Sequence, residues 1–124
     1  MSLKPLLWVG GSKKALDDVP EYVKDVFGSA LLDVQYGDTP HGAKPFGEGL
    51  SSQIWKIVED HDGDTYRAVY TAAFAEVVYV LDVLMKKSKS GIKTPQADIE
   101  RVRQRFKAAK QHHDEHYPSS RRIR

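Results

Sequence analysis

Lysines crowd a short segment in the second half of the chain. Lys86, Lys87, Lys89 and Lys93 follow directly after an apolar run at residues 77–81. Like charges so close together repel one another and contribute little to folding, so a permanent anionic partner is a physical reason to keep them. The competing interpretation is a solvated loop that protects the edge of a sheet.

An arginine inside an upstream apolar segment favours the anionic partner. Arg67 lies between Tyr66 and Ala68 in a run that reads as a strand. A guanidinium stays charged and presents a planar fork to two oxygens, which suits phosphate. The alternative is an edge or solvent-facing arginine that pairs with a carboxylate such as Asp82. Both interpretations remain open at this point.

Length and charge limit the classes of protein that the chain can represent. Its 124 residues predict one domain over residues 1–117 and a disordered basic tail at 118–124. There is no cysteine, so disulfides and thiolate chemistry are excluded. Residues 1–85 carry 7 Lys+Arg against 13 Asp+Glu, net −6, whereas residues 86–124 carry 12 against 4, net +8. Such a molecule would orient on RNA or DNA through its basic part.

Hydrophobic periodicity predicts the elements that must position these cations. Ser12 is expected to cap a short helix, and Pro20 to open a second helix that ends at Gly37. The segment from Gly37 to Gly49 is dense in glycine and proline and is expected to be a loop. Three strands joined by short connections predict an antiparallel meander, followed by an amphipathic helix after Pro95. The expected strands are residues 6–9, 53–59, 65–72 and 77–85.

The fold class predicted from this order is α+β. We expect an N-terminal helical hairpin packed on a small twisted antiparallel sheet, with a C-terminal helix whose apolar stripe includes Phe106. Tyr22, Val26 and Phe27 are expected to bury most of their apolar surface against that sheet.

Two further motifs have the composition of metal sites but not the spacing. Asp60–Asp64 is similar to a calcium loop, yet its glycine falls one position too early, so a hairpin turn is expected. His112, His113 and His116 lie near a helix end and are expected to be exposed. The sequence therefore predicts neither a metal nor another cofactor.

The order of elements and the spacing of five motifs resemble the RelE/ParE toxin superfamily, and more narrowly its phage-related HigB-like branch. The similarity runs over residues 6–112. The motifs that carry it are Trp8-x-Gly-x-Ser12, Lys44-Pro-x-Gly-x-Gly49, Tyr66-Arg67-Ala-Val-Tyr70, Val78-Tyr-Val-Leu81 and Lys86-Lys87-Ser-Lys-x-Gly91-Ile-x-Thr94-Pro95.

The resemblance implies a toxin of a type II toxin–antitoxin pair that acts as a ribosome-dependent mRNA endoribonuclease. RNA carries its own nucleophile, the 2′-hydroxyl, so cleavage needs positioning, a base and cations around the phosphate. Matching positions give Lys56, Arg67, Lys86 and Lys87 as catalytic residues, with either Lys56 or Lys86 as the base. RNA-binding residues would be Lys44, Lys89 and Lys93.

Two other functions remain open. One is a ParE-like toxin that poisons DNA gyrase, and the other is a non-catalytic, phage-derived nucleic-acid-binding module. Asp82 leaves room for the latter, because it stands where many relatives have histidine.

The same resemblance implies the partners. These are a cognate helix-turn-helix antitoxin, the ribosome and mRNA, while the oligomeric state stays open. No stretch reaches membrane-span length and the N-terminus lacks a secretory pattern, so we expect a cytoplasmic protein with no membrane partner.

Overall fold

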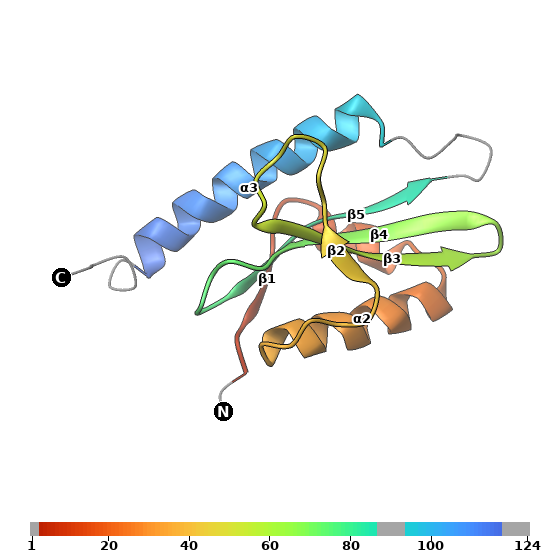
Figure 1. Ribbon diagram of the computed structural model, residues 1–124, viewed down its shortest axis with the longest axis horizontal. Helices are drawn as coiled ribbons and strands as arrows, with labels where there is room; N and C mark the ends of the chain where they lie inside the picture. Colours follow the sequence, from red (N-terminus) through yellow and green to blue (C-terminus); the bar gives the residue numbers. More distant parts are fainter. Residues whose placement is uncertain (1–2, 87–93, 118–124) are drawn as a thin grey trace.

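A computed structural model describes residues 3–86 and 94–117 of the chain (Figure 1). Lys87, Lys89, Lys93 and the tail at 118–124 lie outside the described residues. The elements follow the order β1 (Leu6–Trp8), α1 (Ser12–Asp17), α2 (Glu21–Gln35), β2 (Ala43–Pro45), β3 (Ile54–His61), β4 (Asp64–Thr71), β5 (Val78–Lys86) and α3 (Gln96–His116). The predicted α+β class, with its N-terminal helices and C-terminal helix, is confirmed.

The sheet has the strand order β1-β5-β4-β3-β2. The meander β3-β4-β5 is antiparallel as predicted, with Val58 opposite Arg67 and Arg67 opposite Leu84. β1 joins the other side of β5 as a parallel strand, so the sheet is mixed rather than wholly antiparallel. Two parallel strands need a long connection between them. Between β1 and β5 the chain runs through α1, α2 and the strands β2 to β4, so this requirement is met.

The prediction of a continuous loop from Gly37 to Gly49 is wrong at its centre. Ala43–Pro45 forms β2 and pairs antiparallel with β3, placing Lys44 opposite Lys56. Phe46 continues the pairing, because its backbone N–H donates to the carbonyl of Ile54 at 2.8 Å and its ring is buried. A buried aromatic anchor therefore holds a short edge strand in a segment otherwise rich in turn residues.

The turn between β3 and β4 is the hairpin that the sequence predicts. Asp62 and Gly63 both have positive φ, 51° and 84°, and lie between the paired residues His61 and Asp64. Two left-handed residues in a two-residue connection match the twist of the flanking strands, which is why Asp-Gly is favoured there.

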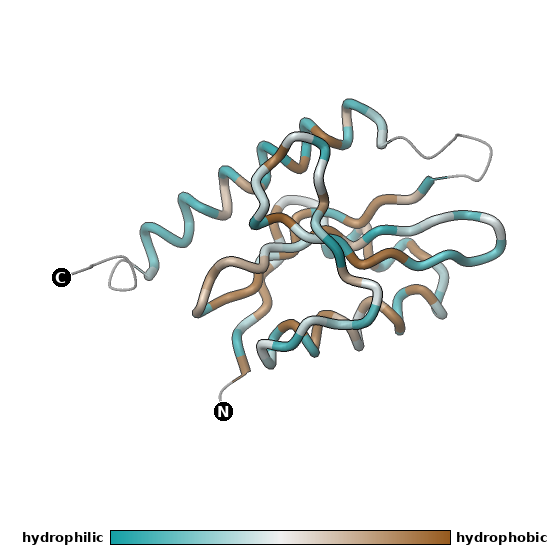
Figure 2. The backbone as a smooth tube through the Cα atoms, viewed as in Figure 1, coloured by the Kyte–Doolittle hydropathy of each residue, from teal (hydrophilic) through white to brown (hydrophobic). Residues whose placement is uncertain are grey.

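Each face of the sheet carries its own core, as Figure 1 shows with α2 on one side and α3 on the other. The core on the α2 side includes Phe27, Leu31 and Ala68. On the α3 side it includes Leu81, Val102 and Phe106. Figure 2 shows the hydrophobic colour concentrated in the strands, whereas α3 is largely hydrophilic on its outer side. No helix within the described ranges is long and apolar enough to cross a membrane.

Two local predictions at the N-terminal helices are wrong. Ser12 does not cap α1; it is the first helical residue, and its buried hydroxyl donates to the carbonyl of Val80 at 3.1 Å. Tyr22 is 56% exposed, and its ring stacks on that of His61 at the end of β3, with the ring centroids 5.4 Å apart. Phe27 is fully buried as predicted.

Candidate functional site: a cationic face of the sheet

The pleat places three predicted site residues on one face of the sheet. Lys44 on β2 lies directly opposite Lys56 on β3, and Lys56 lies opposite Val69 on β4. Opposite residues in an antiparallel pair point to the same side, and so do residues two apart along one strand. Arg67 is two residues from Val69, so Lys44, Lys56 and Arg67 share the face on which α3 also packs.

Lys86 belongs to the same face, at the end of β5. It pairs with Thr65, which lies two residues from Arg67 on β4. Lys86 is buried rather than free in solvent. Four of the predicted cations therefore project from one side of the sheet, and the remaining three lie in the segment that the structure does not describe.

The environment of Lys56 is unfavourable to its charge. Its side chain is partly buried, and its Nζ lies 5.7 Å from the centre of the Phe46 ring. Burial lowers the pKa of Lys56 from its ordinary value, and the positive charge of Arg67 lowers it further; the negative charge of Glu48 opposes them with a smaller effect, and Lys44 lowers the pKa least of all. A lysine with a depressed pKa keeps more neutral amine near neutral pH and can accept a proton.

Arg67 lacks the carboxylate partner that the alternative interpretation required. Its Nε is buried and has no hydrogen-bond partner among the described residues. Asp82, the proposed partner, instead accepts from Arg101 Nε through Oδ2 at 2.7 Å and from the backbone N–H of Val83 through Oδ1 at 2.9 Å, and the same Oδ1 lies 3.2 Å from Arg105 Nη1. The pairing of Arg67 with Asp82 is therefore wrong.

Asp82 is the centre of an ion network that sequence reasoning missed. Arg101 also donates to Asp98 at 2.7 Å, and Arg105 donates to the carbonyl of Leu81 at 2.9 Å. A Cβ on Gly10 would lie 2.7 Å from Arg105 Nε, so the turn after β1 leaves room for this guanidinium. The network joins β5 to α3 and satisfies Asp82 without using Arg67. No sequence signal marks it, since Asp82 lies 19 residues from Arg101 and 23 residues from Arg105.

Glu48 is a second residue that sequence reasoning passed over. It has a positive φ of 57°, unusual for a side-chain-bearing residue, and lies between Gly47 and Gly49. Its negative charge raises the pKa of Lys56, against the effects of burial and of Arg67. The Gly-x-Gly spacing that follows Lys44 was the sequence feature that could have pointed to Glu48.

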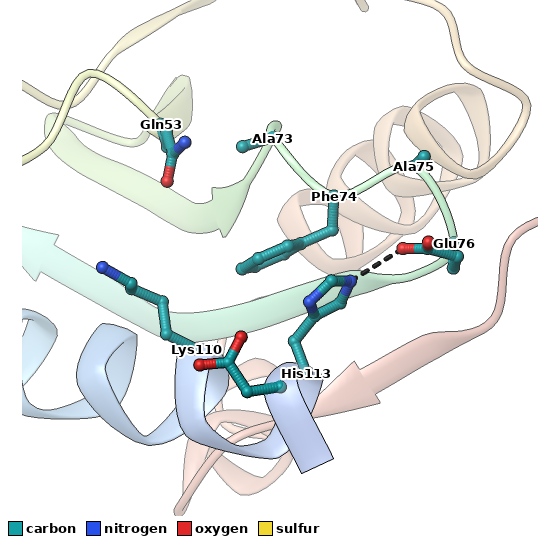
Figure 3. A pocket seen from close by; sticks show the side chains of 8 residues that line it. Gln53, Ala73, Phe74, Ala75, Glu76, Lys110 and His113 are labelled. Carbon is teal, nitrogen blue, oxygen red and sulfur yellow. Dashed lines mark hydrogen bonds and ion pairs between the residues drawn. The ribbon is translucent and has the colours of Figure 1, made fainter. Parts of the chain in front are cut away.

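Of the three C-terminal histidines predicted to be exposed, His116 is exposed, whereas His112 is partly buried and His113 is buried. His113 is buried, its Nε2 lies 2.7 Å from Glu76 Oε1, and its ring stacks on Phe74 at 4.2 Å (Figure 3). His112 Nδ1 lies 2.7 Å from the Tyr79 hydroxyl. These two histidines are covered because the apolar stripe of α3 continues past Ala109 and reaches the loop between β4 and β5.

The hollow beside this contact, about 480 Å³, does not coincide with the cationic face. Lys110 and His113 in its wall are accompanied by Glu76 and Asp114, so positive charge does not dominate there (Figure 3). Among the described residues, no group of three or more His, Cys, Asp or Glu side chains could hold a metal ion. The cationic face has the more specific chemistry, because positive side chains outnumber acidic ones there and the buried Nε of Arg67 has no hydrogen-bond partner within residues 3–86 and 94–117.

Comparison with known proteins gives a family and a fold. The model of the family "Phage derived protein Gp49-like (DUF891)" matches residues 14–107. The free-state structure of a double arginine-to-alanine mutant of the E. coli toxin RelE superposes with a TM-score of 0.55 at 18% identity, over 86% of this chain and 98% of that one. No curated protein matches the chain in sequence. The RelE-like fold that the resemblance implied is thus confirmed, and placement in the HigB-like branch stays a prediction.

Proposed function

The chain belongs to the Phage derived protein Gp49-like family and has the fold of RelE, and from this premise we propose that it is the toxin of a type II toxin–antitoxin pair that cuts mRNA on the ribosome. The observation that carries the proposal is the unbalanced charge on the sheet. Arg67 has a buried, unpartnered Nε and lies close enough to Lys56 to depress the pKa of that lysine. An RNA phosphate would supply the missing anion.

The proposed reaction is an attack by a ribose 2′-oxygen on the adjacent phosphorus. Lys56, as the neutral amine, takes the 2′-hydroxyl proton while the O2′–P bond forms and the P–O5′ bond breaks. The products are a 2′,3′-cyclic phosphate and a 5′-oxygen that acquires a proton from water or the ribosome. Arg67 holds two phosphate oxygens and stabilises the charge that develops on them.

The other cations have supporting roles in this proposal. Lys44, directly opposite Lys56 at the sheet edge, would bind the neighbouring phosphate. Lys86 and Lys87 would extend the phosphate clamp from the end of β5, and Lys89 and Lys93 would hold RNA beyond it. No strong general acid accompanies these residues in the proposal, which suits an enzyme whose site is completed by the ribosome and its codon geometry.

The proposed partners follow from the same assignment. A cognate helix-turn-helix antitoxin would silence the toxin in the cytoplasm by covering or deforming the cationic face, and the ribosome would present the mRNA to it. Antitoxin binding is tested by co-expression and affinity purification with the product of the adjacent gene.

A cleavage assay with matched arginine variants tests the proposal. Purified chain is added to ribosomes halted on a defined mRNA and, separately, to the same mRNA alone. We expect cleavage only on the ribosome, and Arg67→Ala should slow it by about 10² to 10³, the usual cost of losing one such electrostatic contact. Arg103→Ala is the control, because Arg103 is exposed on α3 and pairs only with Glu100 in the described part of the chain.

Equal cleavage by Arg67→Ala and the wild-type chain would remove Arg67 from the site. Absence of cleavage by the folded wild-type chain under both conditions would remove the endoribonuclease assignment itself. Thermal melts of all three proteins establish that any loss is catalytic rather than structural.

A further inference from the structure

The turn that follows β2 is anchored on the cationic side of the sheet. Phe46, directly after β2, is buried in the core on the α3 side, and Leu50 packs against the same core. The backbone N–H of Leu50 donates to the carbonyl of Gly47 at 3.0 Å and closes the turn. Both ends of the turn therefore lie on the side that carries Lys56, whose Nζ is 5.7 Å from the centre of the Phe46 ring.

The backbone of this turn is unfavourable for the residue at its centre. Gly47, Glu48 and Gly49 have φ values of 77°, 57° and 76°. A turn with positive φ at both central residues, here Glu48 and Gly49, is usually built from Gly, Asn or Asp. Glutamate has neither the conformational freedom of glycine nor the short polar side chain of Asn and Asp, so it is disfavoured there. Residues held in such conformations cluster at functional sites.

Glu48 acts on Lys56 without being bonded to it. Its side chain is exposed, and its negative charge raises the pKa of Lys56. Within residues 3–86 and 94–117, no hydrogen bond or ion pair holds the Glu48 carboxylate. A carboxylate bonded to Lys56 would occupy the place of a phosphate. An unbonded carboxylate nearby leaves Lys56 accessible but places a like charge beside any phosphate that approaches it.

We propose that Glu48 determines which RNA the cationic face accepts: its carboxylate repels the phosphates of free RNA, whereas RNA held in position by the ribosome overcomes this repulsion. Specificity often depends on an element that is unfavourable to the wrong partner. Free RNA gains its binding energy from the face alone, so a like charge there weakens its binding directly. RNA on the ribosome meets the face at a high effective concentration, because the ribosome already positions it. The inference rests on the proposed nuclease function and adds a residue that limits its substrate.

A charge series at position 48 tests the inference without any cleavage step. Glu48→Gln removes the negative charge and Glu48→Lys reverses it, while both side chains meet the same backbone strain as glutamate. The ligand is a short single-stranded RNA with 2′-O-methyl riboses, which lacks the attacking hydroxyl, and fluorescence anisotropy measures its binding. At low salt we expect Glu48→Gln to bind it about two- to fivefold more tightly than the wild-type chain, the usual size of one exposed charge contact. Glu48→Lys should bind it more tightly still, and both gains should shrink as salt rises.

Glu59 provides a matched control on the same sheet. It lies on β3 three residues from Lys56, and therefore on the opposite face, where its partner in the register is Tyr66 of the α2-side core. Glu59→Gln and Glu59→Lys make the same changes in net charge and should change RNA binding less than the substitutions at Glu48 do. NMR titration adds a local readout, because Glu48→Gln should lower the pKa of Lys56 and Glu59→Gln should leave it unchanged.

Cleavage of free and ribosome-bound mRNA separates this inference from the proposed function. Glu48→Lys should cut free mRNA faster, relative to the same mRNA on the ribosome, than the wild-type chain does, and Glu59→Lys should keep the wild-type ratio. Equal RNA binding by the wild-type chain and both Glu48 variants, with weaker binding by Arg67→Ala, overturns the inference and leaves the proposed function standing. Equal gains from the Glu48 and Glu59 variants also overturn it, because net charge would then be the cause. A folded wild-type chain that cuts neither mRNA overturns the proposed function, together with the selectivity assigned to Glu48.

Discussion

The surroundings of Lys56 lower its pKa below that of a lysine side chain in water. Burial disfavours its charged form first, and the nearby Arg67 disfavours it further. Neither effect requires a carboxylate, and the nearest acidic influence, Glu48, acts in the opposite direction. The same geometry that would bind a phosphate therefore prepares a lysine to accept a proton.

Replacing Arg67 should raise the pKa of Lys56. Arg67→Gln removes a positive charge beside the ammonium, so the charged form becomes more favourable and Lys56 should titrate at higher pH than in the wild-type chain. NMR titration of the lysine side-chain resonances measures this directly in the free protein. Arg103→Gln removes a positive charge from the exposed side of α3 and should leave the pKa of Lys56 unchanged.

The same shift has a kinetic counterpart. If Lys56 is the base, the cleavage rate of the wild-type chain rises with pH as Lys56 loses its proton. In Arg67→Gln the rise should move to higher pH, in addition to the overall loss of rate. An unmoved Lys56 titration in Arg67→Gln would show that the two cations are not coupled.

At the scale of elements, the ion network around Asp82 fixes how α3 lies on the sheet. Asp82 is almost fully buried, and two arginines of α3 reach it from consecutive turns of the helix. Removing one member of a buried pair leaves the other charge uncompensated, which is more damaging than losing an exposed ion pair.

Asp82→Asn should therefore destabilise the fold by roughly 3 kcal/mol. Urea unfolding followed by circular dichroism measures the change. Asp98→Asn is the matched control, since Asp98 is more exposed and, in the described part of the chain, forms its ion pair with Arg101, and it should cost less than about 1 kcal/mol. Similar losses in the two variants would mean that Asp82 does not anchor the helix.

The turn after β1 depends on the same network. Gly10 has a positive φ of 57°, and a side chain there would collide with the Arg105 guanidinium. Gly10→Ala should cost about 1 to 3 kcal/mol from backbone strain, and more if the arginine must move. In an Arg105→Ala background the additional cost should fall, because the collision is absent while the strain remains. A double-mutant cycle in urea measures the difference, and strictly additive losses would exclude the contact.

At the scale of the whole molecule, the antiparallel meander and the helices follow from the sequence because their signals are local. Hydrophobic periodicity locates α2 and α3, and short connections require β3, β4 and β5 to run antiparallel. β2 could not be predicted, since it depends on the buried ring of Phe46 and on pairing with β3. The parallel pairing of β1 with β5 joins segments about 70 residues apart and has no local signal.

Only part of the cationic face could be predicted, because only part of it depends on local sequence signals. Arg67 and Lys56 lie in recognisable strands, but only the register shows that they share a face with Lys44. The environment of Asp82 and His113 depends on where α3 crosses the sheet, which periodicity does not specify. Tyr22 was misplaced because an apolar pattern around α2 does not reveal which of its flanking positions faces solvent.

Charge is divided between the two sides of the sheet. The N-terminal helices α1 and α2 carry four carboxylates, at Asp17, Glu21, Asp25 and Asp33, against three lysines, at Lys13, Lys14 and Lys24. The opposite face presents Lys44, Lys56 and Arg67. A polyanion such as ribosome-bound mRNA would be attracted by the cationic face more than by the nearly balanced helical side, which orients the encounter.

Mapping of mRNA ends in cells tests the central claim most directly. The chain is expressed briefly with a reporter mRNA and with a matched reporter that lacks its start codon, and primer extension locates new 5′ ends while plasmid supercoiling reports on gyrase. We predict cuts inside the coding region of the translated reporter, none in the untranslated one, and unchanged supercoiling. Intact reporter mRNA together with double-strand breaks in DNA would contradict the account and favour a gyrase-poisoning toxin.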